Sequence, residues 1–130
     1  MAVALTDKSK ELLDGKSFAT IATLQPDGSP QLSVVWAKRD GDDILVSTVE
    51  GRRKHLNLVK DDRVTVLIIP PEAPYTYVEF RGTASLTTEG GRELTDELSV
   101  KYTGKEYGND GPDDVRVVVR ITPTKVIGQD

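Results

Sequence analysis

The sequence predicts one mainly β domain, built as a six-stranded antiparallel barrel with short helices at its periphery. Six runs of strand length, apolar or alternating, are separated by turns rich in Pro, Gly and Asp. The run at 63–69 is apolar on both faces, and closing the sheet buries such a strand without open edges. The 130 residues are enough for a single domain, 1–130, with a hydrophobic core.

The N-terminal segment predicts a helix followed by a hairpin. Thr6 or Asp7 can cap the helix, and Gly15 can end it. Residues 17–24 are small, β-branched and uncharged, which favours a strand. The turn at 25–28 follows, in which Pro presets φ and Gly accepts a positive φ.

Two further strands are predicted directly after this turn. Residues 31–38 alternate between the two faces, and residues 44–49 are mostly apolar. The acidic, Gly-containing segment 39–43 separates them as a second tight turn. Together with 17–24, these strands predict a three-stranded antiparallel meander.

The middle of the chain predicts a short helix and a central strand. The helix covers 52–60, with Leu56 and Val59 as its apolar contacts. The run at 63–69 is the most apolar of the chain and predicts a central strand. The proline-rich segment 70–74 cannot continue a sheet, because proline lacks the ladder donor.

The C-terminal part predicts two strands around a helix. Residues 75–87 alternate as a long strand, in which Gly82 marks a bend or bulge. Leucines at i, i+4 spacing predict a helix over 92–102, and a polar Gly-rich loop follows it. The final strand covers 115–127 and is expected to be interrupted near Pro123.

Composition excludes several classes of function. The formal net charge of −4 argues against a general nucleic-acid binder. The chain has no Cys, which excludes disulfides, thiolate zinc sites and thiol catalysis, and its one His cannot form a metal cage alone. No apolar run approaches a membrane span, and no signal pattern opens the chain, so we expect a cytoplasmic protein without membrane contact or metal.

The basic run at 51–57 stands out in this acidic chain. It contains Arg52, Arg53 and Lys54 in a row, directly after the predicted strand 44–49. A helix start offers free N–H groups and a positive dipole end, so added cations make a site for phosphate. The alternative is a solvated basic turn. The sequence around the run favours the phosphate site.

The order of these segments resembles a known family. A Pro-Asp-Gly turn is followed by Pro-Gln-Leu-Ser-Val-Val-Trp, Ile-Leu-Val-Ser-Thr, Arg-Arg-Lys-His-Leu-Asn-Leu and Asp-Asp-Arg-Val. This order is similar to that of the pyridoxamine 5′-phosphate oxidase-like proteins, which are split β-barrels of the FMN-binding type. More narrowly, it resembles the small actinobacterial members that use the deazaflavin coenzyme F420. The resemblance implies a six-stranded antiparallel split β-barrel.

The resemblance also implies a homodimer with two cofactor sites at the subunit interface. The cofactor phosphate would lie at the basic helix start, and its ring against the second and third strands. The segment that contains Pro70, Pro71, Tyr75 and Tyr77 would reach across from the second subunit. The cofactor-binding residues carried over by position are Arg52, Lys54, Arg53, Asn57, Gln31, Leu32, Ser33, Val35, Trp36, Ser47, Thr48, Pro70 and Pro71.

The activity implied is that of a reductase dependent on coenzyme F420. Its reduced deazaflavin would transfer a hydride to an electron-poor conjugated small molecule, such as an enone, lactone or quinone-like compound. One alternative is an FMN-dependent oxidoreductase on the same scaffold, and another is a non-catalytic protein that binds a flavin or deazaflavin. The family's pyridoxamine phosphate oxidases carry a C-terminal extension that helps to bind the substrate, and this sequence stops just past the last predicted strand. The departure argues against pyridoxamine phosphate oxidase activity but leaves a flavin in the same cleft open.

No residue of the sequence is identified as catalytic. Tyr75 and Tyr77 are candidates for a hydrogen-bond or proton donor, although alternating aromatic residues on a strand more often pack across it. His55 directly follows the three cations of the basic run, and we expect a helix-surface position or a minor phosphate contact for it instead of a role as a general acid.

Overall fold

The computed structural model describes residues 2–128 as one antiparallel sheet with three short helices. The strands are β1 (Phe18–Leu24), β2 (Pro30–Val35), β3 (Lys38–Asp40), β4 (Asp43–Val49), β5 (Arg63–Ile69), β6 (Val78–Thr87) and β7 (Arg116–Gly128). The helices are α1 (Asp7–Asp14), α2 (Arg53–Lys60) and α3 (Gly91–Thr103), with a 3-10 turn η1 (Pro74–Thr76). The strand order across the sheet is β2-β1-β5-β6-β7-β4-β3. The mainly β class with peripheral helices is therefore confirmed.

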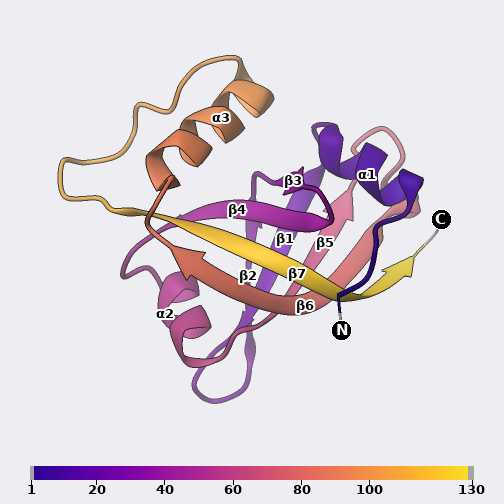
Figure 1. Cartoon of the computed structure of the whole chain (residues 1–130), viewed down its shortest axis with the longest axis horizontal. Coiled ribbons are helices and arrows are strands. Elements are labelled where there is room, and N and C mark those ends of the chain that lie inside the picture. The colour runs from indigo at the N-terminus through magenta and orange to yellow at the C-terminus, as the bar shows by residue number, and fades with distance from the viewer. Residues whose placement is uncertain (1, 129–130) are drawn as a thin grey trace.

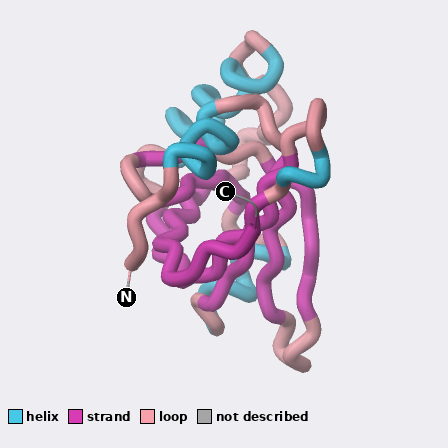
Figure 2. Tube along the Cα trace, turned by 90° about the vertical axis from the view of Figure 1, so that its right-hand side faces the viewer, coloured by secondary structure: helices cyan, strands magenta, loops and turns pink. Residues whose placement is uncertain are grey.

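The sheet curls around a hydrophobic core and has the shape of a split barrel. Figure 2 shows the strands bending round an interior, and Figure 1 shows the helices outside the strands. Ile21, Val66 and Phe80, from three neighbouring strands, are fully buried in this interior. As predicted, the apolar strand β5 is central and lies between β1 and β6.

The sheet has seven strands instead of six, and no pairing within residues 2–128 closes it from β2 to β3. The extra strand arises because the predicted strand 31–38 breaks after Val35. The backbone of Ala37 bonds to side chains of α3 instead of a neighbouring strand. Its carbonyl accepts from Lys101 Nζ at 2.6 Å and Tyr102 Oη at 3.3 Å, and its N–H donates to Tyr102 Oη at 3.3 Å.

The predicted meander is only half correct for the same reason. β1 and β2 form the expected antiparallel hairpin, with Ala22 opposite Leu32. β2 does not pair with β4, because the bend at Trp36 and Ala37 carries the chain to the other edge of the sheet. There β4 pairs with β3 and with β7, where Ile44 lies opposite Ile121.

Two predicted boundaries near β6 and β7 are also corrected. Tyr75 lies in the 3-10 turn η1, which has proline in its first turn, so β6 begins only at Val78. The bulge at Gly82 is confirmed by a register shift between Arg81 and Gly82. β7 runs through Pro123 without interruption, because the bulge places Pro123 opposite Gly82.

α2 lies against β1 with a different face from the one predicted. Leu56 and Val59 are 41% and 62% exposed, whereas Asn57 and Leu58 are buried. Asn57 Nδ2 donates to Thr23 Oγ1 and to a second side-chain oxygen, each at 3.0 Å. These hydrogen bonds compensate the burial of the amide, which periodicity alone did not assign to the core.

α1 and α3 form as predicted, and α3 packs closely on β7. Thr6 caps α1 by accepting from Ser9 N at 3.1 Å. A Cβ placed on Gly91 would lie 2.2 Å from Arg116 O, so glycine is required for this approach. No helix within the described range is long and apolar enough to cross a bilayer.

Candidate functional site

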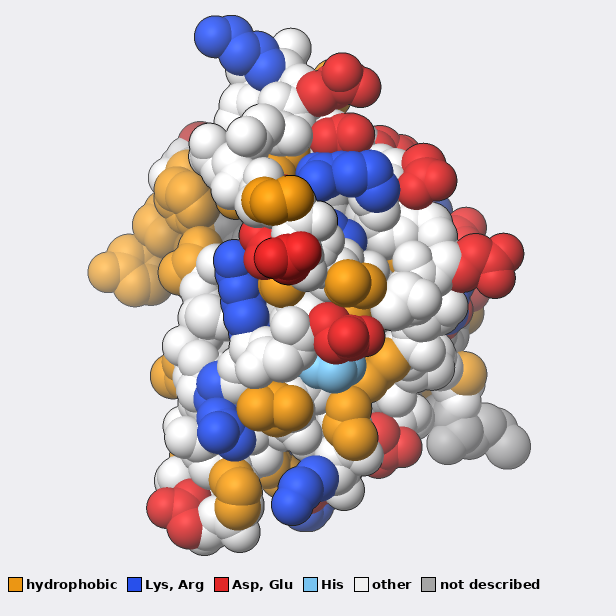
Figure 3. All heavy atoms as spheres, turned by 90° about the vertical axis from the view of Figure 1, so that its left-hand side faces the viewer, with side chains coloured by type: hydrophobic (Ala, Val, Ile, Leu, Met, Phe, Trp, Pro, Cys, Tyr) orange, Lys and Arg blue, Asp and Glu red, His pale blue; other side chains and the backbone are white. Residues whose placement is uncertain are grey.

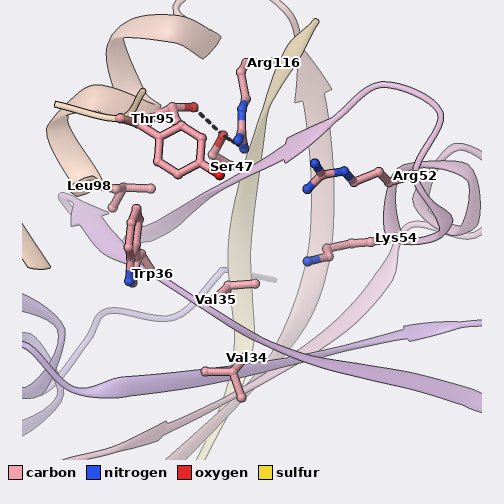
Figure 4. Close-up of a pocket in the computed structure, with 10 residues that line it drawn as sticks. Val34, Val35, Trp36, Ser47, Arg52, Lys54, Thr95, Leu98 and Arg116 are labelled. Carbon is pink, nitrogen blue, oxygen red and sulfur yellow. Dashed lines mark hydrogen bonds between the residues drawn. The ribbon is translucent and has the colours of Figure 1, made fainter. Parts of the chain in front are cut away.

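A cavity of about 290 Å³ opens where the end of β2, strand β4, the start of α2, helix α3 and β7 meet. Cationic, hydroxyl, aromatic and aliphatic side chains share its wall, and Figure 4 shows them converging on one space. The lining residues are Val34, Val35, Trp36, Ser47, Arg52, Lys54, Thr95, Leu98, Tyr107 and Arg116.

Three cations form one side of the cavity. Arg52 and Lys54 come from the start of α2 and point inward, and Arg116 enters from β7 (Figure 4). Arg52 is the N-cap residue of α2, but its side chain makes no capping hydrogen bond. Across the described residues, neither the Arg52 side chain nor the Lys54 side chain has a hydrogen-bonding or ion-pair partner. Two positive charges in the wall are therefore left without an anion.

Lys54 carries its charge in an unfavourable environment. Its side chain is half-buried, and burial lowers the pKa of Lys54 below its ordinary value of 10.5. The nearby charges of Arg52 and Arg116 lower this pKa further. An anion bound beside Lys54 would reverse both effects, because an opposite charge favours the ammonium form.

The turn that leads into α2 holds the cations in place. Gly51 has φ of 91°, which glycine adopts without strain, and its N–H donates to His55 Nδ1 at 3.0 Å. This bond uses the lone pair of Nδ1, so the imidazole orders the turn. The expected surface position of His55 on the helix agrees with this role.

Arg116 is held by a network instead of standing free. Its Nε and Nη2 atoms donate to the two carboxylate oxygens of Asp110 at 2.8 and 2.7 Å. Its Nη1 donates to Ser47 Oγ at 3.3 Å, and Ser47 Oγ lies 2.6 Å from Thr95 Oγ1. Thr95 Oγ1 donates to Gly91 O at 2.8 Å, so Ser47 donates to Thr95.

The opposite side of the cavity is apolar and aromatic. Trp36 and Leu98 face the cations across the space, with Val34 and Val35 below them (Figure 4). The Trp36 ring stacks on Tyr102 at 5.7 Å between centroids and meets Tyr107 edge-on at 6.0 Å. The cavity therefore has a cationic end and a flat apolar end, which suits a ring that carries a phosphate.

Five of the residues carried over from the family line this cavity: Val35, Trp36, Ser47, Arg52 and Lys54. Arg53 and Asn57 instead line a separate hollow along α2 and interact with each other, from Arg53 Nη1 to Asn57 Oδ1 at 3.4 Å.

The remaining candidates lie elsewhere on the fold. On β2, Gln31 is half-buried, Leu32 is 62% exposed, and the Ser33 hydroxyl is buried without a partner in the described chain, as is that of Thr48 on β4. Pro70 is buried and Pro71 exposed in the connection between β5 and β6. On the same connection Tyr75 and Tyr77 are 84% and 42% exposed and do not line the cavity.

Sequence reasoning missed half of the lining, and all the missed residues except Val34 come from the C-terminal part of the chain. The missed residues are Val34, Thr95, Leu98, Tyr107 and Arg116. Tyr107 is a single aromatic residue in a polar loop, which is the one local signal that pointed to a packed role. Arg116 precedes the apolar run of β7, and only the pairing of β7 with β4 brings it beside Ser47.

The surface around the α2 side of the molecule is mixed in charge. Figure 3 shows Lys and Arg side chains along the middle of this face, with hydrophobic side chains between and beside them. A second apolar surface lies on the outward face of β1 and β2, where Phe18, Leu32 and Val34 are 56%, 62% and 71% exposed. Val34 belongs both to this face and to the cavity lining.

Comparisons with known proteins agree with the fold. A solved structure named F420 reductase is 26% identical, with a TM-score of 0.84, and the match covers 96% of this chain and all of that one. The conserved hypothetical protein Rv2991 from Mycobacterium tuberculosis is 27% identical, with a TM-score of 0.78, and the match covers 99% of this chain and 86% of that one.

A third structure shows the same fold at lower identity. A Listeria innocua protein, provisionally described as a pyridoxamine 5′-phosphate oxidase, is 22% identical with a TM-score of 0.73, over 94% of this chain and 95% of its own. The family model for pyridoxamine 5′-phosphate oxidase matches residues 5–130, which is nearly the whole chain. The chain therefore belongs to the pyridoxamine 5′-phosphate oxidase family.

Proposed function

We propose that the protein is an oxidoreductase that binds a phosphate-bearing flavin or deazaflavin, and specifically a reductase that uses coenzyme F420. One observation carries the proposal: Arg52 and Lys54 point into the cavity without an anionic partner in the described chain. Burying or crowding unpaired cations costs free energy, and a bound phosphate would offset that cost. Membership of the family and the likeness to the F420 reductase support the same assignment.

The residues of the cavity fit such a cofactor. Arg52 and Lys54 would bind the phosphate at the start of α2, where the helix dipole also favours an anion. Trp36, Val35 and Leu98 would hold the ring system on its apolar side and keep water from it. The reduced deazaflavin would supply the hydride, and the protein would bind, orient and shelter it.

The size of the cavity supports a site shared between two copies of the chain. At about 290 Å³ it lies at the lower end of the range for small-molecule sites, although the cofactor has three fused rings. Val34 links the cavity to the exposed apolar face of β1 and β2. We infer a homodimer in which this face is covered and the β5–β6 connection, with Pro71, Tyr75 and Tyr77, extends toward the partner's cavity. In this dimer, a tyrosine of the connection would be available to donate a hydrogen bond or proton to a substrate in the partner's cavity.

Titration with the two cofactors tests the assignment. Coenzyme F420 and FMN are added separately to the protein, and quenching of their fluorescence gives the two dissociation constants. We expect tight binding of coenzyme F420 and weaker binding of FMN. The reverse order would replace the leading proposal with an FMN-dependent enzyme of the same family.

Substitution of the two unpaired cations tests their role. Arg52→Ala and Lys54→Ala should each weaken cofactor binding by about 1.5–3 kcal/mol, the usual value of a hydrogen bond to a charged group. Arg53→Ala is the matched control, because Arg53 is the neighbouring cation and lies outside the cavity. If both variants bind the cofactor with unchanged affinity, the basic run is a solvated turn and not a phosphate site.

Turnover separates an enzyme from a cofactor carrier. Reduced coenzyme F420 bound to the protein is mixed with a panel of enones, lactones and quinones, and reoxidation of the cofactor is followed by absorbance. We expect at least one electron-poor conjugated compound to accelerate reoxidation. If no compound of the panel reoxidises the bound cofactor faster than it reoxidises free cofactor, the result would favour a cofactor carrier.

A further inference from the structure

The loop between α3 and β7 is attached to the cavity by two side chains. Its composition predicts a solvated loop, yet the Asp110 side chain is only 8% exposed and Tyr107 is half-buried. Tyr107 N–H donates to Asp96 Oδ1 at 3.1 Å, and Asp110 accepts from Arg92 Nη1 at 2.6 Å. These contacts hold the loop against α3 at the cationic end of the cavity.

Asp110 uses the binding surface of Arg116 that an anionic ligand would need. A guanidinium grips a carboxylate or phosphate best through two parallel N–H groups. In Arg116, the Nε and Nη2 pair is already bonded to Asp110 at 2.8 and 2.7 Å. The Tyr107 ring covers a face of the group at 4.9 Å, and Nη1 donates to Ser47.

The charges at this end of the cavity therefore divide into two sets. Arg116 and Asp110 neutralise each other, and the hydrogen bonds of Arg116 hold the pKa of Asp110 below its ordinary value. Arg52 and Lys54 stay unpaired in the described chain. The pocket thus presents a net of two positive charges instead of three.

We propose that Asp110 is a specificity-determining residue: it occupies Arg116, leaves the anion to Arg52 and Lys54, and restricts the pocket to phosphate groups of one or two negative charges. The proposal rests on the proposed phosphate-binding function of the cavity. Without Asp110, a third cation would face the ligand and favour more highly charged anions such as pyrophosphate.

Calorimetric titration with inorganic orthophosphate and pyrophosphate tests this assignment without any cofactor. Asp110→Asn should tighten pyrophosphate binding by about tenfold and orthophosphate binding by less, since one charged hydrogen-bonding group is released. Arg116→Gln leaves the Asp110 carboxylate paired with Arg92 alone, so it should weaken orthophosphate binding by less than about fivefold, whereas Lys54→Ala should weaken it by about tenfold or more. Arg120→Gln is the matched control, because this arginine of β7 pairs with Asp40 and Asp43 instead of Asp110.

Two outcomes overturn the proposal. One is a loss of orthophosphate affinity in Arg116→Gln as large as in Lys54→Ala, which would make Arg116 an anion ligand. The other is unchanged or weaker pyrophosphate binding in folded Asp110→Asn. Asp110→Asn leaves an uncompensated buried cation, so the double variant Asp110→Asn with Arg116→Gln is measured as well. Because it removes both charges, it should bind both anions within about twofold of the unmodified protein.

The anion titrations also separate this proposal from the proposed function. Failure of coenzyme F420 and FMN to bind would overturn the function and leave the selectivity between orthophosphate and pyrophosphate measurable. Normal cofactor binding with a phosphate-binding Arg116 would overturn only the role of Asp110. Absence of anion binding by both the unmodified protein and Asp110→Asn would overturn the selectivity role.

Discussion

The ammonium group of Lys54 lies in an environment that disfavours its charge in the free protein. It is half-buried beside Arg52 and Arg116, and no carboxylate of the described chain pairs with it. Burial and like charges each disfavour the charged form, so the free protein holds this group at a cost. A ligand that brings negative charge would recover that cost, so such a site would favour anions.

The affinity for the phosphate-bearing cofactor should therefore depend on pH through Lys54. In the free protein the pKa of Lys54 lies below 10.5, and a bound anion raises it again. Protons are then taken up on binding, so affinity should fall as the pH rises, starting below pH 10.5. Cofactor titrations across the alkaline range measure this. Lys54→Arg keeps its charge and should bind with a nearly constant affinity; parallel profiles for both proteins would contradict the prediction.

At this scale the sequence predicted what is local and missed what is assembled by tertiary contacts. Arg52 and Lys54 are close in the chain, so the basic run together with the segments around it indicated an anion site. Arg116 reaches the same cavity only because β7 pairs with β4, and Thr95 only because α3 packs on β7. Asn57 was predicted beside the phosphate, but its buried hydrogen bonds are to Thr23 and Gln25, and no sequence pattern encodes that pair.

At the scale of elements, the last turn of α3 determines the path of the strand that lines the site. Lys101 Nζ donates to Leu13 O and Ala37 O, both at 2.6 Å, and Tyr102 Oη donates to Ser17 O at 2.8 Å. These bonds tie α3 to the end of α1 and to the bend after β2. The same bend carries Trp36 into the cavity.

The break in the predicted strand 31–38 follows from this clamp. Residues 31–38 alternate between the two faces without a Gly or Pro, so periodicity gave no sign of a bend. Side chains from α3 satisfy the backbone of Ala37 in place of a ladder partner. Local patterns predicted the helices and the central strand well, because those depend on periodicity; the edge of the sheet depends on contacts across the chain.

The clamp gives the free energy of unfolding a defined pH dependence. Burial lowers the pKa of Lys101 to about 8 in the folded protein, against 10.5 for a free lysine. Between about pH 8 and 10.5 the unfolded chain therefore holds more protons than the folded chain, and stability rises with pH. The charged Lys101 ammonium group thus lowers the free energy of unfolding most below pH 8. This destabilisation disappears as the pH approaches 10.5.

Lys101→Met isolates this contribution, because it removes the titrating group and keeps much of the side-chain volume. We expect urea unfolding to show that the unmodified protein gains stability relative to Lys101→Met as the pH rises from 8 to 10. Lys105→Met, an exposed lysine just after α3, serves as the control and should show no such shift. A pH-independent difference for Lys101→Met would show that its ammonium group is not disfavoured in the fold.

At the scale of the whole molecule, the open sheet and the apolar outer face belong together. The edge strands of the sheet, β2 and β3, each have no pairing partner on one side within the described chain. Beside β2, the outward positions of β1 and β2 expose large apolar side chains, among them Phe18, Leu32 and Val34. We expect an exposed apolar patch of this kind to be an interaction surface. A second copy of the chain would cover it and close the cavity that Val34 lines.

Leu32→Asp tests this assembly without entering the cavity. Leu32 is 62% exposed and does not line the cavity, so the folded subunit should tolerate the change. In a two-fold dimer each copy loses about 2 kcal/mol of leucine burial, which weakens association roughly a thousandfold in total. Light scattering should then show monomers at concentrations where the unmodified protein is dimeric. The affinity for the cofactor should also be lower in the variant, because the dimer is lost. Val59→Asp on α2 is equally exposed at 62% and should leave both properties unchanged; a Leu32→Asp protein that stays dimeric would place the interface elsewhere.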